Sequence, residues 1–384
     1  MHNNLLLFTR DSFMKILLCA ATGHNPVNIL PLESDQINPD LIYVAITSSM
    51  QQQGDNLIAE LKAIGKKVEP LKIEHEQSLQ SLIQQYESWL LQHQDDEIIV
   101  NLTGGTKPMS IAAYQLFSGY GFRCFYQNLN PNQLVWLDDE TIISDIGAKI
   151  SLERYLKSYQ FDVIKKQKLN ELDQYYKKYA SLLYDELCKP GRYQQTCQLI
   201  SKINAYAAKP KLKDLKDFSL NYEEEAFLTH LSHETDLLKL KANTIAWETE
   251  QDRAFIAGGW IEYLTASMLT GENYRDISLS VEISKSTQRA KAKTFQEIDV
   301  MAMQQQQLFI VECKTVNWKN ATHASESIYK LSALGDIGGL NTKAVFVSLY
   351  DLPDAAKTRA AEHNIHVIAG QSAILQLKQR LLSI

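Results

Sequence analysis

The stretch EIIVNLTGGTKPM, residues 97–109, decides how the first part of the chain folds. Ile98, Ile99 and Val100 form a short β-branched run, which predicts a buried strand. Two glycines, two threonines and a lysine follow, and Pro108 suits the first turn of a helix. Glycines let backbone N–H groups approach an anion, so the pattern predicts a phosphate-binding loop before a helix N-terminus. The loop lacks the Gly-Lys-Ser/Thr ending of a Walker A motif, and an ordinary Gly-Gly turn is the alternative.

On both sides of this stretch, short apolar runs alternate with longer helix-patterned segments up to about residue 150. This alternation is typical of an α/β fold in which helices wrap a parallel sheet. Ligands of such a Rossmann-like sheet bind at the carboxyl ends of the strands, in the loops that begin at Ala21, Thr47 and Thr103. The expected strands are Lys15–Ala20, Leu41–Thr47, Lys67–Ile73, Glu97–Leu102 and Arg123–Asn128, and the expected helices are Gln53–Ile64, Gln77–His93 and Pro108–Tyr120.

The last 130 or so residues predict a second α/β domain with a mixed sheet. Long apolar runs there are bounded by charged residues and are separated by helix-patterned segments. The expected order is helix Trp260–Leu269, strands Ile277–Ile283, Glu297–Met303 and Leu308–Thr315, helix Ser325–Leu334, strand Ala344–Leu349, a helix, strand His366–Ala369 and a final helix.

Two of these strands carry charged residues on one face. Residues two apart in a strand point the same way, so Glu297 and Asp299 share one face of their strand. Glu312 and Lys314 share one face of the next strand. Charges beside long apolar strands are costly unless a cation compensates them. Asp299, Glu312 and the Cys313 carbonyl form a set of hard oxygen donors suited to Mg²⁺ or Mn²⁺, with Lys314 placed to serve an attacking water. A surface ion-pair network is the alternative.

The middle of the chain predicts a helical connector. Residues 151–217 are rich in Tyr, Lys, Leu and Gln at helical spacing, and residues 151–220 carry a net charge of +6 in a chain whose total is −6. This basic segment suits a phosphate backbone, or it is a solvated helix face. A helix over Tyr222–Leu231 followed by a hairpin over Leu237–Glu248 fits a winged helix or a linker with a β-arm. The predicted domains are residues 1–150, 151–245 and 246–384.

The composition restricts the class of protein. With 384 residues, 45% of them hydrophobic, the chain is too apolar to be disordered and long for a single core. No apolar run approaches the roughly 18–20 residues of a membrane span, and Arg10 and Asp11 interrupt the N-terminal apolar stretch, so neither a membrane partner nor a secretory signal is expected. Translation starts at Met1 or Met14. Five cysteines without a C-x-x-C pair indicate neither a disulfide scaffold nor a zinc ribbon, and the cytoplasm is the expected location.

The nonapeptide 101–109 and the order of elements over residues 14–150 resemble CARF domains, the ligand-sensing modules of CRISPR-associated proteins. The resemblance implies a homodimer that binds a cyclic oligoadenylate in a pocket shared across its two-fold axis. A two-fold pocket suits an even-numbered ring, which favours cyclic tetra-adenylate as the activator. Carried over position by position, the resemblance implies that the ligand is held by Thr22, Gly23, Thr47, Ser48, Thr103, Gly104, Gly105, Thr106 and Lys107.

The last part of the chain resembles the PD-(D/E)xK nuclease superfamily, with its restriction-endonuclease-like fold. Asp299, Glu312 and Lys314 match the signature, with Ile298 in place of its proline, and Glu262 corresponds to an acidic residue on the first helix. The resemblance implies that these four residues are catalytic. It also implies that Asp299, Glu312, the Cys313 backbone carbonyl and Glu262 hold Mn²⁺ or Mg²⁺.

Together the two parts resemble CARF nucleases of type III CRISPR systems. This implies a cyclic-oligoadenylate-activated, metal-dependent endonuclease that cuts RNA or DNA in antiviral defence. Two alternatives stay open: a cyclic-oligoadenylate-responsive DNA-binding regulator with an inactive nuclease fold, and ligand degradation in the N-terminal pocket as an added activity. The sequence leaves open whether the substrate is RNA, single-stranded DNA or duplex DNA.

Four further features accompany the predicted nuclease site. The basic stretch Gln288–Lys293 is either a clamp for a phosphate backbone or a solvated loop. Glu297 faces the site or solvent, Lys330 is a weaker candidate for its rim, and His323 is near in sequence but more typical of an incidental loop histidine.

Overall fold

The computed structural model describes residues 13–129, 132–139, 142–144, 150–208, 220–241, 244–271, 273–285, 296–318 and 321–384. The chain divides into two compact units, Met1–Gln160 and Phe161–Ile384. Among the described residues, no helix has the length and apolar character needed to span a bilayer.

The first unit is built on a seven-stranded sheet with the order β3-β2-β1-β4-β5-β6-β7. The first five strands run parallel, and β6 and β7 add antiparallel strands at one edge. Its elements are β1 (Lys15–Ala20), α1 (Pro26–Ile29), β2 (Leu41–Thr47), α2 (Gln51–Ala63), β3 (Val68–Ile73), α3 (Leu79–Leu90), β4 (Glu97–Asn101), α4 (Lys107–Gly119), β5 (Arg123–Leu129), β6 (Asn132–Trp136), β7 (Ile142–Ser144) and α5 (Leu152–Ser158).

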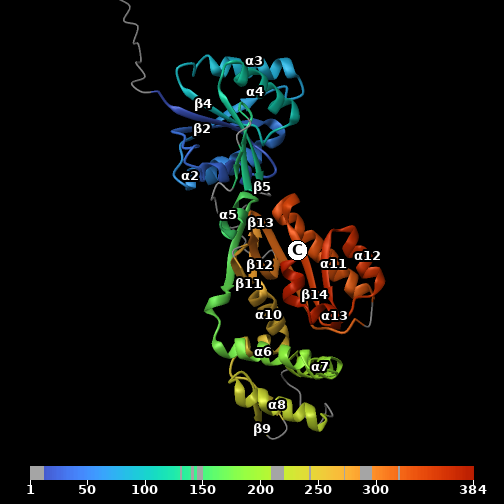
Figure 1. Ribbon diagram of the computed structural model, residues 1–384. Helices are drawn as coiled ribbons and strands as arrows, with labels where there is room; N and C mark the ends of the chain where they lie inside the picture. Colours follow the sequence, from blue (N-terminus) through green and yellow to red (C-terminus); the bar gives the residue numbers. More distant parts are fainter. Residues whose placement is uncertain are drawn as a thin grey trace, which may run out of the picture. The chain divides into compact units, whose positions relative to one another are not determined.

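Both faces of this sheet are covered by helices, as the continuous apolar strands predict. Ile16 and Leu18 of β1 pack against α3 and α4, whereas Leu17 packs in the core that includes Leu57 of α2. Figure 1 shows α3 and α4 on one face of the sheet and α2 on the other. The strand order changes direction between β1 and β4, so the carboxyl ends of these two strands form the topological switch point, where sheets of this kind bind ligands.

The second unit is built on a six-stranded mixed sheet with the order β15-β14-β13-β12-β11-β8. Strands β13, β14 and β15 are parallel, and the others pair antiparallel. Its elements are β8 (Phe161–Lys168), α6 (Gln174–Cys188), α7 (Tyr193–Ala208), α8 (Tyr222–Glu234), β9 (Lys239–Lys241), β10 (Thr244–Ala246), α9 (Glu250–Ala254), α10 (Trp260–Met268), β11 (Tyr274–Lys285), β12 (Gln296–Gln304), β13 (Gln307–Lys314), α11 (Ala321–Gly335), β14 (Lys343–Ser348), α12 (Asp354–Glu362), β15 (Ile365–Ala369), α13 (Gln371–Ile374) and α14 (Leu377–Leu382).

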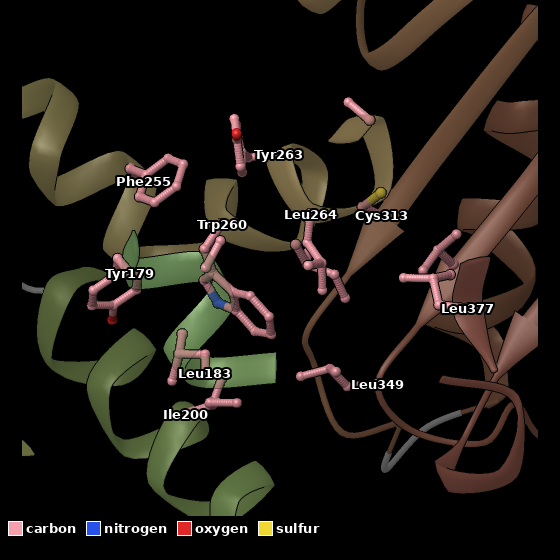
Figure 2. Packing of buried hydrophobic residues seen from close by; sticks show 14 of the residues in the cluster. Tyr179, Leu183, Ile200, Phe255, Trp260, Tyr263, Leu264, Cys313, Leu349 and Leu377 are labelled. Carbon is pink, nitrogen blue, oxygen red and sulfur yellow. The ribbon is translucent and has the colours of Figure 1, made fainter. Parts of the chain in front are cut away.

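Helices of the expected connector share the core of the second unit. Tyr179 and Leu183 of α6 and Ile200 of α7 are buried in one hydrophobic cluster with Trp260 of α10. Figure 2 shows these side chains gathered around the Trp260 ring. A fully buried tryptophan side chain contributes several kcal/mol of stability, about 3–5 by large-to-small substitution, so α6 and α7 are firmly tied to α10.

The structure differs from the sequence expectation in the first part of the connector. Residues 161–168 were expected to be helical, but they form β8, the edge strand that pairs with β11. Pairing along a sheet edge outweighs the weak helical preference of a lysine-rich segment. The expected hairpin is present as β9 and β10 after α8, an arrangement that suits a β-arm as well as a winged helix. The winged helix and the three-part division therefore stay predictions.

Candidate functional site

A buried amide network lies at the switch point between β1 and β4 of the first unit. The Asn101 side chain, at the end of β4, donates hydrogen bonds to the Val27 carbonyl (3.0 Å) and to Asn28 Oδ1 (2.9 Å). The Asn28 amide in turn donates to the Ala20 carbonyl at the end of β1 (2.9 Å). Both asparagines are almost fully buried. The network therefore ties the loop after β1 to the end of β4.

Thr103 belongs to the same network. Its hydroxyl donates to Asn101 Oδ1 (2.7 Å), and its backbone N–H donates to the same oxygen (3.0 Å). The hydroxyl also accepts a hydrogen bond from the Gln127 backbone N–H (2.7 Å). These bonds fix the beginning of the Gly-Gly loop against β5.

The two glycines of the loop are required by close packing and by backbone conformation. A Cβ atom on Gly104 would lie 2.5 Å from the Ala20 carbonyl oxygen, which leaves no room for a side chain. Gly105 has φ +79°, a left-handed conformation that favours glycine. Thr106 then caps α4, because its hydroxyl accepts from the Met109 N–H (3.5 Å). The loop thus presents a helix N-terminus at the switch point, as a phosphate site requires.

The other predicted ligand residues lie on neighbouring loops at the same sheet edge. Gly23 follows β1, Ser48 follows β2 and Lys107 begins α4, and all three are exposed. Thr22 is half-buried, and Thr47 is buried with its hydroxyl 3.0 Å from Ser49 Oγ. The fold thus gathers the nine predicted residues at the carboxyl ends of β1, β2 and β4.

Sequence reasoning did not single out His24, which lies in the loop after β1. Its Nδ1 is hydrogen-bonded to the Tyr159 hydroxyl just after α5, and its ring packs against Tyr155. Its Nε2 is buried and has no hydrogen-bond partner, and burial lowers the pKa of His24 to about 4. His24 therefore connects the binding loop to the segment that leaves the first unit.

In the second unit, three oxygen atoms converge on the Lys314 ammonium at the end of β13. Glu312 Oε1 lies 2.6 Å from Lys314 Nζ, the Cys313 carbonyl 3.1 Å and Asp299 Oδ2 3.5 Å. Asp299 also accepts a hydrogen bond from the Cys313 N–H across the strand pair (2.7 Å). These are the carboxylates and the carbonyl that the sequence pattern indicated.

The electrostatics of this cluster favour a cation. Burial, reinforced by the charge of Glu312, raises the pKa of Asp299 to about 6, although Lys314 opposes the shift. Burial and the charge of Asp299 raise the pKa of Glu262 on α10 to about 8. Burial alone would lower the pKa of Lys314, but Asp299 and Glu312 outweigh that effect and raise it. Burial therefore disfavours the charged forms of Asp299 and Glu262, and a bound cation would favour them.

The donor set fits a hard divalent cation. Glu312 is almost fully buried, and its second carboxylate oxygen, Oε2, has no hydrogen-bond partner. Two carboxylates and a carbonyl already point at one positive charge, and Mg²⁺ and Mn²⁺ prefer such oxygen ligands. Within the described part of the chain, no three His, Cys, Asp or Glu side chains converge as a metal site, so the Cys313 carbonyl and water would have to complete the shell.

The structure also places the weaker sequence candidates. Lys330 on α11 lies 3.4 Å from Glu312 Oε1, so it joins the cluster. Glu297 is exposed, and its charge contributes to the raised pKa of Glu262. His323 is exposed and paired with Glu326 (3.2 Å) at the start of α11. The basic stretch 288–293 lies outside the described residues.

Two family models match the chain. Residues 25–155 match the Card1 CARF domain, and residues 249–384 match the Card1-like endonuclease domain. The chain is a CARF domain joined to a Card1-like endonuclease domain. The Gly-Gly loop after β4 lies in the residues that match the CARF domain, and the Asp299, Glu312 and Lys314 cluster lies in those that match the endonuclease domain.

Solved structures show the same fold over nearly the whole chain. Can2 from Sulfobacillus thermosulfidooxidans, solved in complex with cyclic tetra-adenylate, aligns with a TM-score of 0.77 at 21% identity over 96% of this chain and 98% of Can2. VC1899 from Vibrio cholerae aligns with a TM-score of 0.81 at 20% identity over 96% of this chain and 97% of VC1899. A type III CRISPR defence DNA nuclease activated by cyclic oligoadenylate aligns with a TM-score of 0.53 at 14% identity, over 88% of this chain and 46% of that nuclease. No curated protein matches the chain.

Proposed function

We propose that the chain is a cyclic-oligoadenylate-activated, divalent-metal-dependent nuclease of type III CRISPR defence. The observation that carries this proposal is the convergence of Asp299, Glu312 and the Cys313 carbonyl on the Lys314 ammonium group. This cluster lies in a domain of the endonuclease family. The buried and unpartnered Oε2 of Glu312 supports a metal rather than a finished ion pair.

The roles of the catalytic residues follow from their contacts. Asp299, Glu312 and the Cys313 carbonyl would hold Mg²⁺ or Mn²⁺, with Glu262 as a further oxygen ligand. A bound divalent ion supplies a more acidic water and neutralises charge on the phosphate. Lys314 stays protonated beside the two carboxylates, so it orients the attacking water and stabilises the developing negative charge by hydrogen bonding.

The CARF domain is the proposed sensor. The helix N-terminus at Thr106, the exposed Lys107 and the glycine backbone form a cradle suited to phosphate groups. The related fold of Can2, solved with cyclic tetra-adenylate, supports that ring as the activator. The activator binds between two copies of the chain and favours one arrangement of this homodimer, which raises nuclease activity through its differential affinity for that arrangement.

The direct test is cleavage of labelled single-stranded RNA, single-stranded DNA and supercoiled plasmid with Mn²⁺ or Mg²⁺. Each substrate is incubated with and without cyclic tetra-adenylate, using the wild type and Glu312→Gln, which keeps the size of the side chain and removes its charge. Cutting that needs both metal and activator and disappears in the variant supports the proposal and identifies the substrate. Binding of the activator without cutting of any substrate would contradict it.

A further inference from the structure

The segment that leaves the first unit is held by the loops after β1 and β2, which carry predicted ligand residues. It comprises Ser158, the last residue of α5, and the two residues that follow it, Tyr159 and Gln160. Gln160 is the last residue of the first unit, and Phe161 begins β8 in the second. We call residues 158–160 the exit segment. Any change in its position is passed directly to the start of β8.

Two residues of the loop after β1 bond to the exit segment. His24 Nδ1 is hydrogen-bonded to the Tyr159 hydroxyl, and the two ring centroids lie 5.6 Å apart. The side-chain amide of Asn25, which is almost fully buried, donates to the Ser158 carbonyl (3.5 Å). The predicted ligand residue Gly23 directly precedes His24. A ligand that moves this loop therefore also moves the exit segment.

The beginning of α2 bonds to the same segment. The Gln52 side-chain amide donates to Gln160 Oε1 (2.9 Å), and the Gln53 carbonyl accepts from the Asn25 amide (3.3 Å). Helix α2 begins shortly after Ser48, another predicted ligand residue, and it also packs against α5. The exit segment is thus tied to two of the loops on which a ligand is expected to act.

Two features of these contacts suit an element with more than one arrangement. Gln160 has φ +69°, a left-handed conformation that is costly for a residue other than glycine and persists only where its surroundings hold it. His24 Nε2 and Asn25 Oδ1 are buried and have no hydrogen-bond partner. Burying an unsatisfied polar atom is costly, which narrows the energy gap to an arrangement in which these atoms find partners.

Strand β8 connects the exit segment to the strand that carries Asp299. Lys165 of β8 pairs with Glu282 of β11, and Glu282 pairs in turn with Glu297 of β12. Asp299 lies two residues further along β12. Neighbouring strands of a sheet are about 4.8 Å apart, so β8 lies about 10 Å from the strand of the carboxylate cluster. A shift of β8 therefore reaches that strand through two rows of backbone hydrogen bonds.

We propose that the exit segment transmits activator binding to the nuclease sheet, with the hydrogen bond between His24 and Tyr159 as the coupling contact. This rests on the proposed function and adds how the activator regulates the cut. The activator changes the loops after β1 and β2, these loops move the exit segment, and β8 follows because Gln160 is joined to it. The pairing of β8 with β11 carries the change towards Asp299. His24 is a positioning residue, because it acts through Tyr159.

The test compares three full-length variants with the wild type: His24→Phe, Tyr159→Phe and the double variant. Phenylalanine keeps an aromatic ring at each position and removes the hydrogen bond. Tyr120→Phe is the matched control, because it removes the hydroxyl of an exposed tyrosine at the end of α4 remote from the Gly-Gly loop. Calorimetry gives the affinity for cyclic tetra-adenylate. Cleavage rates with saturating activator and without it give the stimulation of cutting.

We expect both single variants to bind cyclic tetra-adenylate within about threefold of the wild-type affinity. Their stimulation of cutting should fall at least about fivefold, because coupling between two sites is typically about 5- to 150-fold. The double variant should lose no more than the single variants, because all three remove the same contact. A merely structural contact would leave the stimulation at saturating activator unchanged. Stimulation equal to that of Tyr120→Phe would therefore overturn the proposal, and so would weakened activator binding with full stimulation at saturation.

Hydrogen exchange separates this proposal from the proposed function. The activator should change the exchange of the backbone amides of residues 158–168 in the wild type and not in Tyr159→Phe. That result without cutting of any nucleic acid would overturn the proposed function and keep the coupling contact. Activator-dependent cutting that is the same in the wild type and in both single variants would overturn the coupling contact alone. A wild type that does not bind the activator, or binds it without any change in exchange or cutting, would overturn both.

Discussion

The two polar sites of this chain differ in how completely their buried groups are hydrogen-bonded. In the CARF domain, the Asn101 side chain donates to two acceptors and accepts from two donors of Thr103. In the endonuclease domain, Glu312 is buried with one carboxylate oxygen unpartnered, and Asp299 has a raised pKa. Around Asn101 the first site is a finished scaffold that shapes a loop for a ligand, although Nε2 of the neighbouring His24 is buried without a partner. The second is a buried acidic cluster whose charged form a metal ion would stabilise.

The largest effect is expected at the carboxylate cluster of the endonuclease domain. Asp299→Asn removes the charge of a proposed metal ligand while keeping a hydrogen-bond acceptor for the Cys313 N–H. We expect cleavage to fall about 10³-fold or more, which corresponds to about 4 kcal/mol of transition-state stabilisation. The measurement is the single-turnover rate at saturating metal and activator. A loss smaller than about tenfold would show that Asp299 is not a metal ligand.

A large effect on stability is expected where the loops after β1 and β4 touch. Gly104→Ala places a Cβ 2.5 Å from the Ala20 carbonyl oxygen, which forces the two loops apart. We expect the free energy of unfolding of the CARF domain to fall by about 1–3 kcal/mol, and the affinity for the activator to fall with it. The matched control is Gly119→Ala, at the end of α4, the helix that follows this loop, where a Cβ meets no atom within 4 Å. Equal denaturation midpoints for the two variants would contradict this account.

A smaller effect separates the scaffold from the ligand contacts in the same loop. Thr103→Val removes the hydroxyl that joins Asn101 Oδ1 to the Gln127 N–H and leaves that donor without its partner. We expect a loss of about 1–2 kcal/mol in the free energy of unfolding, measured by chemical denaturation. Thr103→Ser keeps the hydroxyl and should restore most of the loss. Failure of the serine variant to restore stability would mean that the methyl group, not the hydroxyl, matters.

The smallest effect is a pH dependence at Glu262. Burial and the charge of Asp299 raise its pKa in the folded chain to about 8, so ionisation at higher pH destabilises the metal-free fold. The cost is absent below the unfolded pKa near 4.5, grows as pH rises, and is complete above about pH 8.

Glu262→Gln imitates the neutral form, so without metal its unfolding midpoint should exceed that of the wild type at pH 9. The free energies of unfolding of the two proteins should differ by about 1 kcal/mol at pH 9, after allowance for solvent screening, and should differ little at pH 5. With excess Mn²⁺ at pH 9 the wild type should have the higher unfolding midpoint, because its Glu262 carboxylate can then bind the metal ion. Curves that stay parallel at all pH values would show that Glu262 is not coupled to the site.

Much of this architecture could be predicted because burial leaves a local signature. The apolar runs that became β1, β4, β12 and β13 were recognisable, and the charged residues Asp299, Glu312 and Lys314 stood out inside them. The convergence of these charges also followed from alternation along paired strands.

The remainder depends on partners that are distant in sequence. β8 was predicted as helix because its lysines resemble a solvated helix face, and only its pairing with β11 makes it a strand. The hydroxyl of Thr103 looked free for a ligand, but Gln127, far along the chain, uses it. Lys166 of β8, Lys177 of α6 and Arg275 of β11 line one cavity of the second unit, and no local pattern could have joined them.

The central claim is that one region binds the activator and the other performs the cut. The most direct test measures both activities in the full-length chain, with cyclic tetra-adenylate binding followed by calorimetry and nucleic-acid cleavage followed with Mn²⁺. We predict that Glu312→Gln binds the activator as tightly as the wild type and cuts nothing, and that Gly104→Ala binds it more weakly and needs more of it to cut. Cleavage by Glu312→Gln at the wild-type rate, or cleavage that is indifferent to the activator, would contradict the claim.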